Sequence, residues 1–208
     1  MQRLGIFGGT FDPIHWGHLL LAETALDQVR LEQVIWVPSL HPPHKQAALF
    51  EHRIEMVQQA IADNPGFAVS LIEKSRSGAS YAINTLTDLS ADYPNTQWYW
   101  IIGLDAFQTL PHWYRGQELA RLCNWLIAPR FLSGENITQS ESICKQVAQK
   151  LTEQSANIHW QLLNIPLVGL SSSLIRNLCR DRKSIRYLVP KSVKIYIDNH
   201  NLYKDRLG

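Results

Sequence analysis

The chain opens with Met1-Gln-Arg-Leu-Gly-Ile-Phe-Gly-Gly-Thr-Phe-Asp-Pro-Ile-His-Trp-Gly-His18, the stretch that decides its fold. The apolar run from Leu4 to Phe7 predicts a buried strand, and the glycines and the Asp-Pro pair after it predict a turn. Apolar residues then recur at helical spacing from Trp16 to Arg30. A strand, a glycine-rich turn and a helix N-terminus can hold phosphate, because free backbone N–H groups and the helix dipole both face the anion.

Two histidines stand at the start of this helix, His15 and His18. Residues three apart share a helix face, so both imidazoles can reach the phosphate position, and Gly17 between them lets a ligand approach the backbone. Two alternatives remain open: a pair of solvated histidines, or a zinc site, which would need a third ligand for which the sequence offers no strong candidate. The glycine pair by itself is weak evidence, since neither common phosphate-binding fingerprint, GxGxxG or GxxxxGK[ST], is present.

The bulk properties indicate one soluble domain over residues 1–208. The composition is 45% hydrophobic and 18% charged, and the net charge of +2 gives no case for a nucleic-acid partner. Three widely spaced cysteines argue against a disulfide framework or a zinc site and favour a reducing, cytoplasmic location. No signal sequence or run long enough to span a membrane is seen.

Strands and helices alternate along the whole chain. This alternation predicts an α/β, Rossmann-like fold, with a mainly parallel sheet covered by helices on both faces. Ser80 is expected to cap the helix that starts there. The predicted strands are 4–7, 34–37, 67–72, 97–102, 125–128 and 159–163, and the main predicted helices are 16–30, 51–63, 80–89, 117–122, 140–154, 171–179 and 192–198.

Polar side chains follow several of these strands, where ligands bind in parallel sheets. Lys45 lies in a proline-rich loop, Asp105 directly follows a strand, and Trp113 follows a proline. Ser171–Ser173 can cap a helix and donate hydroxyls, and Arg176 offers a planar fork for phosphate oxygens. Taken singly, each has a structural alternative: a solvated charge, a helix cap or a core tryptophan. Three further arginines are interpreted as surface charges: Arg53, Arg76 and Arg115.

Taken together, these segments resemble a known family. Gly8-Gly-Thr-Phe-Asp-Pro-Ile-His-Trp-Gly-His18 is similar to the GGTFDPxHxGH signature of the HxGH nucleotidyltransferases. Pro42-Pro-His-Lys45, Ser80-Tyr81 with Thr85, Gly103-Leu-Asp105 with Trp113, and Ser171-Ser-Ser-Leu-Ile-Arg176 resemble, in order, the blocks of bacterial nicotinate-nucleotide adenylyltransferases. The resemblance covers essentially the entire chain. The histidine block is shared across the superfamily and suggests the reaction class, whereas the later blocks suggest the pyridine nucleotide.

This resemblance implies that the chain joins ATP and nicotinate mononucleotide to give deamido-NAD and pyrophosphate, with Mg²⁺ carried mainly by the substrate phosphates. His18, His15, Lys45 and Arg176 would be the catalytic residues, and no protein-held metal is expected. The resemblance also implies an ATP site and a mononucleotide site. The ATP site would comprise Gly8, Gly9, Thr10, Phe11, His15, His18, Gly103, Asp105, Arg130, Ser172, Ser173 and Arg176, and the mononucleotide site Lys45, Tyr81, Thr85 and Trp113.

The sequence departs from the family pattern at three places. Ala82 and Ser173 stand where the family usually has threonine, and the Arg-Pro-Gly run common after Arg130 is missing. Three alternatives therefore stay open: the same chemistry on nicotinamide mononucleotide or phosphopantetheine, a non-catalytic nucleotide-binding protein, and a zinc hydrolase. The chain is expected to be a monomer or a homo-oligomer.

Overall fold

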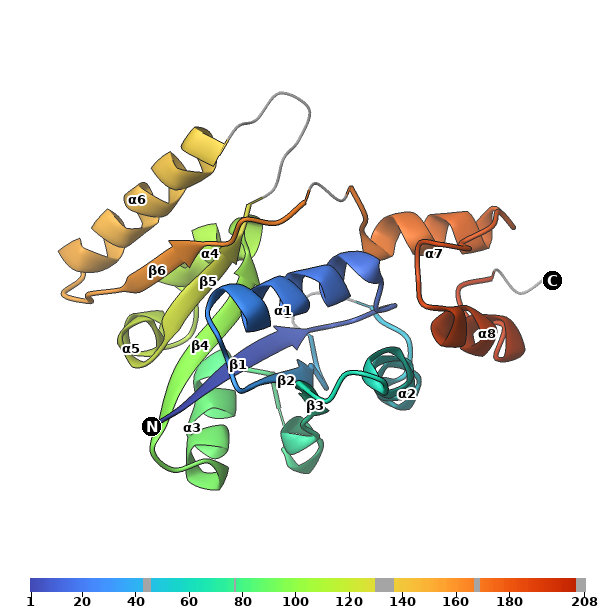
Figure 1. Cartoon of the computed structure of the whole chain (residues 1–208), viewed down its shortest axis with the longest axis horizontal. Helices are drawn as coiled ribbons and strands as arrows, with labels where there is room; N and C mark the ends of the chain where they lie inside the picture. The colour runs from blue at the N-terminus through green and yellow to red at the C-terminus, as the bar shows by residue number, and fades with distance from the viewer. Residues whose placement is uncertain (43–45, 77, 130–136, 167–168, 205–208) are drawn as a thin grey trace.

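The computed structural model describes residues 1–42, 46–76, 78–129, 137–166 and 169–204. Its centre is a six-stranded sheet in the order β3-β2-β1-β4-β5-β6, and every neighbouring pair is parallel (Figure 1). The strands are β1 (Gln2–Gly9), β2 (Gln33–Pro38), β3 (Phe67–Val69), β4 (Thr96–Gly103), β5 (Asn124–Ala128) and β6 (His159–Leu162). The predicted α/β, Rossmann-like fold is therefore confirmed.

Helices cover both faces of the sheet. One face carries α1 (Trp16–Gln28), α2 (Phe50–Ile61), α7 (Ser172–Arg180) and α8 (Lys191–Asn199). The other carries α3 (Ala82–Asp92), α4 (Leu104–Thr109), α5 (Gly116–Leu122) and α6 (Ile137–Glu153). Two short 3₁₀ helices, η1 (Ile72–Ser75) and η2 (Leu110–His112), complete the described elements. In Figure 1, α7 and α8 lie together at one end of the molecule and α6 lies at the other.

The two hydrophobic cores follow from the alternation of side chains along the strands. In β1, Leu4 and Ile6 face the core under α3 to α6, whereas Phe7 faces the core under α1 and α2. A strand that is buried on both faces reads as a continuous apolar run, which is why Leu4 to Phe7 was recognisable.

The strand order places a switch point at the carboxyl end of β1. The chain moves from β1 to β2 on one side and later to β4 on the other, so the loops after β1 and β4 diverge and leave a crevice. The loop from Thr10 to His15 therefore lies where this fold binds ligands.

Two local predictions were wrong. The third strand ends at Val69 rather than residue 72, because the hydroxyl of Ser70 accepts a hydrogen bond from the N–H of Ile72 and turns the chain into η1. Ser80 does not cap α3: the helix begins at Ala82, and the Ser80 hydroxyl donates to Glu73 instead.

No helix in the described part of the chain is both long and apolar enough to cross a bilayer.

The prediction of surface arginines was wrong for two of the three. Arg53 is 1% exposed, and Arg76 is half-buried, where it pairs with Asp88 on α3. Only Arg115 is an exposed charge, paired with Glu118 three residues further along.

Candidate active site

The loop after β1 is held in place by a buried arginine. Arg53 on α2 donates to the carbonyls of Thr10 (2.8 Å), Ala48 (3.0 Å) and Leu40 (3.4 Å). Its guanidinium thus joins the loop after β1 to both ends of the loop after β2. Phe11 follows Thr10 with φ of 49° and packs its ring among Phe7 and Trp36. Phe11 was predicted to contact ATP; its ring is a core side chain that also borders the cavity described below.

The two histidines lie against each other at the start of α1. Their rings stack with centroids 3.7 Å apart. The backbone N–H of His15 donates to Nδ1 of His18 (3.2 Å), so Nδ1 is the acceptor and the ring proton of the neutral imidazole lies on Nε2. His18 therefore has one N–H left to donate to a ligand.

Burial keeps both imidazoles uncharged at neutral pH. His15 is 5% exposed, and burial lowers its pKa to about 4. The pKa of His18 is also lowered well below its ordinary value, first by burial and then by the neighbouring His15. Nδ1 of His15 is buried without a hydrogen-bond partner in the described structure. The pair is thus arranged as neutral hydrogen-bond donors and acceptors rather than as a permanent positive charge.

Gly17 is required by the packing of these rings. A Cβ at this position would lie 3.0 Å from Nδ1 and 3.1 Å from Cε1 of His15. The glycine was predicted to let a ligand approach the backbone; the structure gives the additional reason that it leaves room for the His15 ring.

Helix α7 docks directly on the same loop. The Ser171 hydroxyl caps α7 by accepting from the N–H of Leu174 (3.1 Å), as the sequence predicted. Ser172 donates its hydroxyl to the carbonyl of Pro13 (2.9 Å), and Arg176 donates to the carbonyl of Asp12 (2.8 Å). The N-terminus of a second helix is therefore brought beside the start of α1.

A cavity of about 580 Å³ lies between these helix starts. Its border includes backbone, hydroxyls, an imidazole and a guanidinium, which bind phosphate oxygens, together with the Phe11 ring and the Asp12 carboxylate. The predicted residues that line it are Gly9, Thr10, Phe11, His18, Ser172, Ser173 and Arg176, joined by Asp12 and Gln46.

A second cavity, of about 570 Å³, lies on the other side of the Gly9–Thr10 segment. Trp113 is half-buried at its wall, with its indole N–H bonded to Thr109 (2.8 Å). Tyr81 and Tyr114 are exposed at the same cavity and lie ring against ring at 4.6 Å. Gly8, Tyr81, Thr85 and Trp113 were predicted site residues that line this cavity. The two cavities share Gly9 and Thr10, so molecules bound in each would meet there.

The other predicted site residues are buried, line neither cavity, or lie outside the described residues. Thr85 is 3% exposed and its hydroxyl donates to the buried carboxylate of Glu73 (3.0 Å). Gly103 and Asp105 are exposed at the carboxyl end of β4, at the switch point, but line neither cavity. Lys45 and Arg130 lie outside the described residues.

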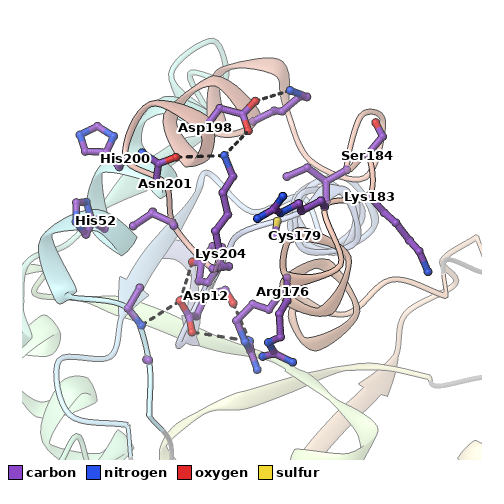
Figure 2. A pocket seen from close by; sticks show the side chains of 18 of the residues that line it. Asp12, His52, Arg176, Cys179, Lys183, Ser184, Asp198, His200, Asn201 and Lys204 are labelled. Carbon is purple, nitrogen blue, oxygen red and sulfur yellow. Dashed lines mark hydrogen bonds and ion pairs between the residues drawn. The ribbon is translucent and has the colours of Figure 1, made fainter. Parts of the chain in front are cut away.

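Sequence reasoning missed the residues that hold the site together. The sequence predicts Asp12 only as part of a turn. In the structure its buried carboxylate accepts hydrogen bonds from the hydroxyl of Tyr203 (2.7 Å) and the N–H of Ala48 (3.2 Å). The same carboxylate lies 3.8 Å from the guanidinium of Arg176 (Figure 2). Glu73 binds Ser80, Thr85 and the N–H of Leu40 (2.9 Å). No local signal marks these residues, because their partners come from distant segments.

The described residues contain no group of three or more His, Cys, Asp or Glu side chains placed to hold a metal ion. The zinc interpretation of His15 and His18 therefore gains no third ligand from them.

The chain matches a known protein family along most of its length. Residues 6–178 match the cytidylyltransferase-like family. The probable nicotinate-nucleotide adenylyltransferase of Trichormus variabilis is 69% identical over 205 residues, which are 99% of each chain. The chain belongs to the nicotinate-nucleotide adenylyltransferase family. A more distant member, from Geobacillus kaustophilus, is 38% identical and aligns with 100% of this chain and 89% of its own length.

Solved structures support the fold. The nicotinic acid mononucleotide adenylyltransferase of Plasmodium falciparum, complexed with NaAD, superposes with a TM-score of 0.80 at 22% identity, covering 98% of each chain. At this identity the likeness speaks for the Rossmann-like architecture alone.

Proposed function

We propose that the chain transfers the adenylyl group of ATP to nicotinate mononucleotide, giving deamido-NAD and pyrophosphate. The observation that carries the proposal is the pair of cavities that meet at Gly9 and Thr10. One is lined by phosphate-binding groups and the other by half-buried and exposed aromatic rings. The family's curated members bear the name of this activity, which supports the proposal. The Plasmodium falciparum protein of the same fold was solved with NaAD, the product that this reaction would give.

In the reaction, an oxygen of the mononucleotide phosphate forms a bond to the α-phosphorus of ATP. The bond from that phosphorus to the bridging oxygen breaks, and its electron pair leaves with pyrophosphate. The protein has little covalent chemistry to supply, because positioning two anions and stabilising the moving charge accounts for most of the rate. This is why the site contains N–H and hydroxyl donors rather than a nucleophile.

The neutral histidines carry the donor role. Nε2–H of His18 would donate to an α-phosphate oxygen, because its Nδ1 is already occupied by the backbone of His15. His15 would hold the stack and face the ATP phosphates beside it. Gly8, Gly9 and Thr10 would bring backbone close to the nucleotide. A neutral donor that is fixed before the substrate arrives needs no reorganisation during the reaction.

Arg176, with the hydroxyls of Ser172 and Ser173, would hold the β- and γ-phosphates at the N-terminus of α7. Lys45 would bridge the incoming phosphate and the ATP chain. The carboxylate of Asp12, the acid at this cavity, is already bonded to Tyr203 and Ala48. Mg²⁺ would therefore be bound mainly by substrate oxygens and water, and would neutralise phosphate charge.

The remaining residues would bind the ribose, the adenine and the pyridine ring of the two substrates. Gly103 and Asp105 would bind the adenosine ribose at the switch point, and Arg130 would lie on the adenine side. Trp113 would stack on the pyridine ring, with Tyr81 and the start of α3 beside it. Ala82 replaces the family threonine at the first residue of α3, so a contact there can run only through the backbone N–H.

Three buried, unpaired thiols are consistent with a reducing compartment, and we place the reaction in the cytoplasm.

The test is pyrophosphate release from ATP with nicotinate mononucleotide and, in a parallel reaction, with nicotinamide mononucleotide. We expect release with both ATP and nicotinate mononucleotide present, and a lower kcat/KM with the nicotinamide form. A preference for the nicotinamide form would change the acceptor, and no release with either would overturn the proposal.

A further inference from the structure

A third cavity, of about 1560 Å³, adjoins the phosphate-binding cavity, and Figure 2 shows side chains that line it. Its walls are the chain from Gln46 to Leu49, helix α7 with the turn after it, helix α8, and residues 200–204. The family resemblance gives this space no role. Its size is sufficient for a ligand rather than for a single ion or water.

The lining is strongly cationic. Seven of its side chains are Lys or Arg and two are acids, so it carries a net charge of +5, while the whole chain carries +2. The rest of the chain is therefore net negative, and the positive charge is concentrated here. The cations are Arg176, Arg180, Arg182, Lys183, Arg186, Lys194 and Lys204, and the acids are Asp12 and Asp198.

The two acids of the lining pair with three of its seven cations, and Asp181, which lies outside the lining, pairs with Lys183 (3.5 Å). Asp12 is occupied by Tyr203, Ala48 and Arg176. Asp198 is shared by two lysines, Lys194 at 2.5 Å and Lys204 at 3.8 Å.

Figure 2 shows Lys204 extending across the middle of the cavity. Arg182 and Arg186 are exposed and have no ion-pair partner among the residues that the structure describes. Each would gain a partner if an anion entered.

This cavity adjoins the phosphate-binding cavity. Asp12, Gln46 and Arg176 line both. Arg176 lies at the border, and one of its guanidinium nitrogens donates to the Asp12 carbonyl and another to the Ser173 hydroxyl (3.2 Å). An anion leaving the β- and γ-phosphate position would therefore meet the cationic cavity immediately.

We propose that this cavity is a second binding site for polyphosphate anions, and that it receives the pyrophosphate released by the reaction. The inference rests on the proposed function for the identity of the anion. The concave shape and the cationic lining favour a small polyanion. The lining offers only His52, His200 and Tyr203 as rings, so bases of a nucleic acid would have few surfaces to stack on.

The test is calorimetric titration of the protein with pyrophosphate while the ATP site is filled with α,β-methylene ATP. We expect one pyrophosphate to bind per chain in addition to the ATP analogue. The double variant Arg182→Gln/Arg186→Gln should weaken this binding at least about tenfold, because it removes two charge-assisted contacts to the anion. Binding should also weaken as salt is raised.

The control is Arg30→Gln/Lys145→Gln, which removes two charges outside all the cavities described above. Arg30 matches Arg182 closely, since both are exposed and have left-handed backbone, with φ of 51° and 55°. The control should bind pyrophosphate as the wild type does. The proposal would be overturned if no pyrophosphate binds while the ATP site is filled. It would also be overturned if the two double variants bind pyrophosphate equally well.

Failure of the proposed function would be seen separately. If the methylene analogue does not bind, the two double variants are compared with pyrophosphate alone, and equal affinity again overturns the second site. A protein that binds pyrophosphate in this cavity but releases none from ATP would refute the reaction and leave the site standing.

Discussion

The neutral state of His15 makes stability depend on pH in a way that can be calculated. Burial lowers the pKa of His15 from 6.5 to about 4, so the unfolded chain binds a proton more tightly than the folded one. Stability from this group is fully present above pH 6.5 and is lost as the pH falls toward 4. Between pH 7 and pH 5 the linkage relation gives a loss of about 2 kcal/mol from His15.

The assay is urea unfolding of the wild type and of His15→Asn at both pH values. Asparagine suits the residue before a helix, so α1 keeps its start while the titrating ring is removed. We expect the wild type to lose about 2 kcal/mol more than the variant between pH 7 and pH 5. An equal loss in both proteins would show that His15 is not held neutral in the folded state and would refute the neutral histidine pair inferred for the site.

Three further substitutions test the supports around the site. Arg53→Met should cost about 3 kcal/mol in urea unfolding, because three part-buried carbonyls lose their donor at about 1 kcal/mol each. A cost below about 1 kcal/mol would contradict this. Gly17→Ala should lower kcat about tenfold, because the added methyl displaces the His15 ring by a few tenths of an ångström. Its Tm should change little, because alanine favours the helix. Unchanged turnover would refute the packing argument. Trp113→Ala should raise KM for the mononucleotide by up to about tenfold and leave kcat similar; an unchanged KM with a collapsed fold would make Trp113 a core residue only.

The sequence predicted the order of the strands and helices and the starts of α1 and α7, because their signals are local. The run from Leu4 to Phe7 and the turn after it are contiguous, and the serine cap of α7 needs only the N–H of Leu174. The meeting of the β1 loop with α7 was accessible only through the family resemblance, since Ser172 and Pro13 are far apart in the chain.

The supporting residues could not be predicted for the same physical reason. Arg53 looks like any charged helix residue, and its burial depends on carbonyls at residues 10, 40 and 48 that converge only after folding. Tyr203 bonds to Asp12 across a separation of 191 residues. Ser80 had the residue type of a helix cap, but Glu73 offered its hydroxyl a stronger, charged acceptor.

The concentration of positive charge around Arg182 was likewise hidden in the sequence. The net charge of +2 suggests nothing unusual, and the cations come from α7, the turn after it, α8 and the residues that follow. Charge that is dilute along a chain can be dense in a cavity.

The most direct test of the site is single-turnover release of pyrophosphate from ATP and nicotinate mononucleotide by the wild type and by His18→Ala. We predict that the wild type forms pyrophosphate and deamido-NAD in equal amounts. The variant should react more slowly by a factor on the order of 10²–10³, with its fold and its binding of ATP retained. Near-wild-type turnover by a folded His18→Ala protein would contradict the claim that this imidazole donates to the α-phosphate.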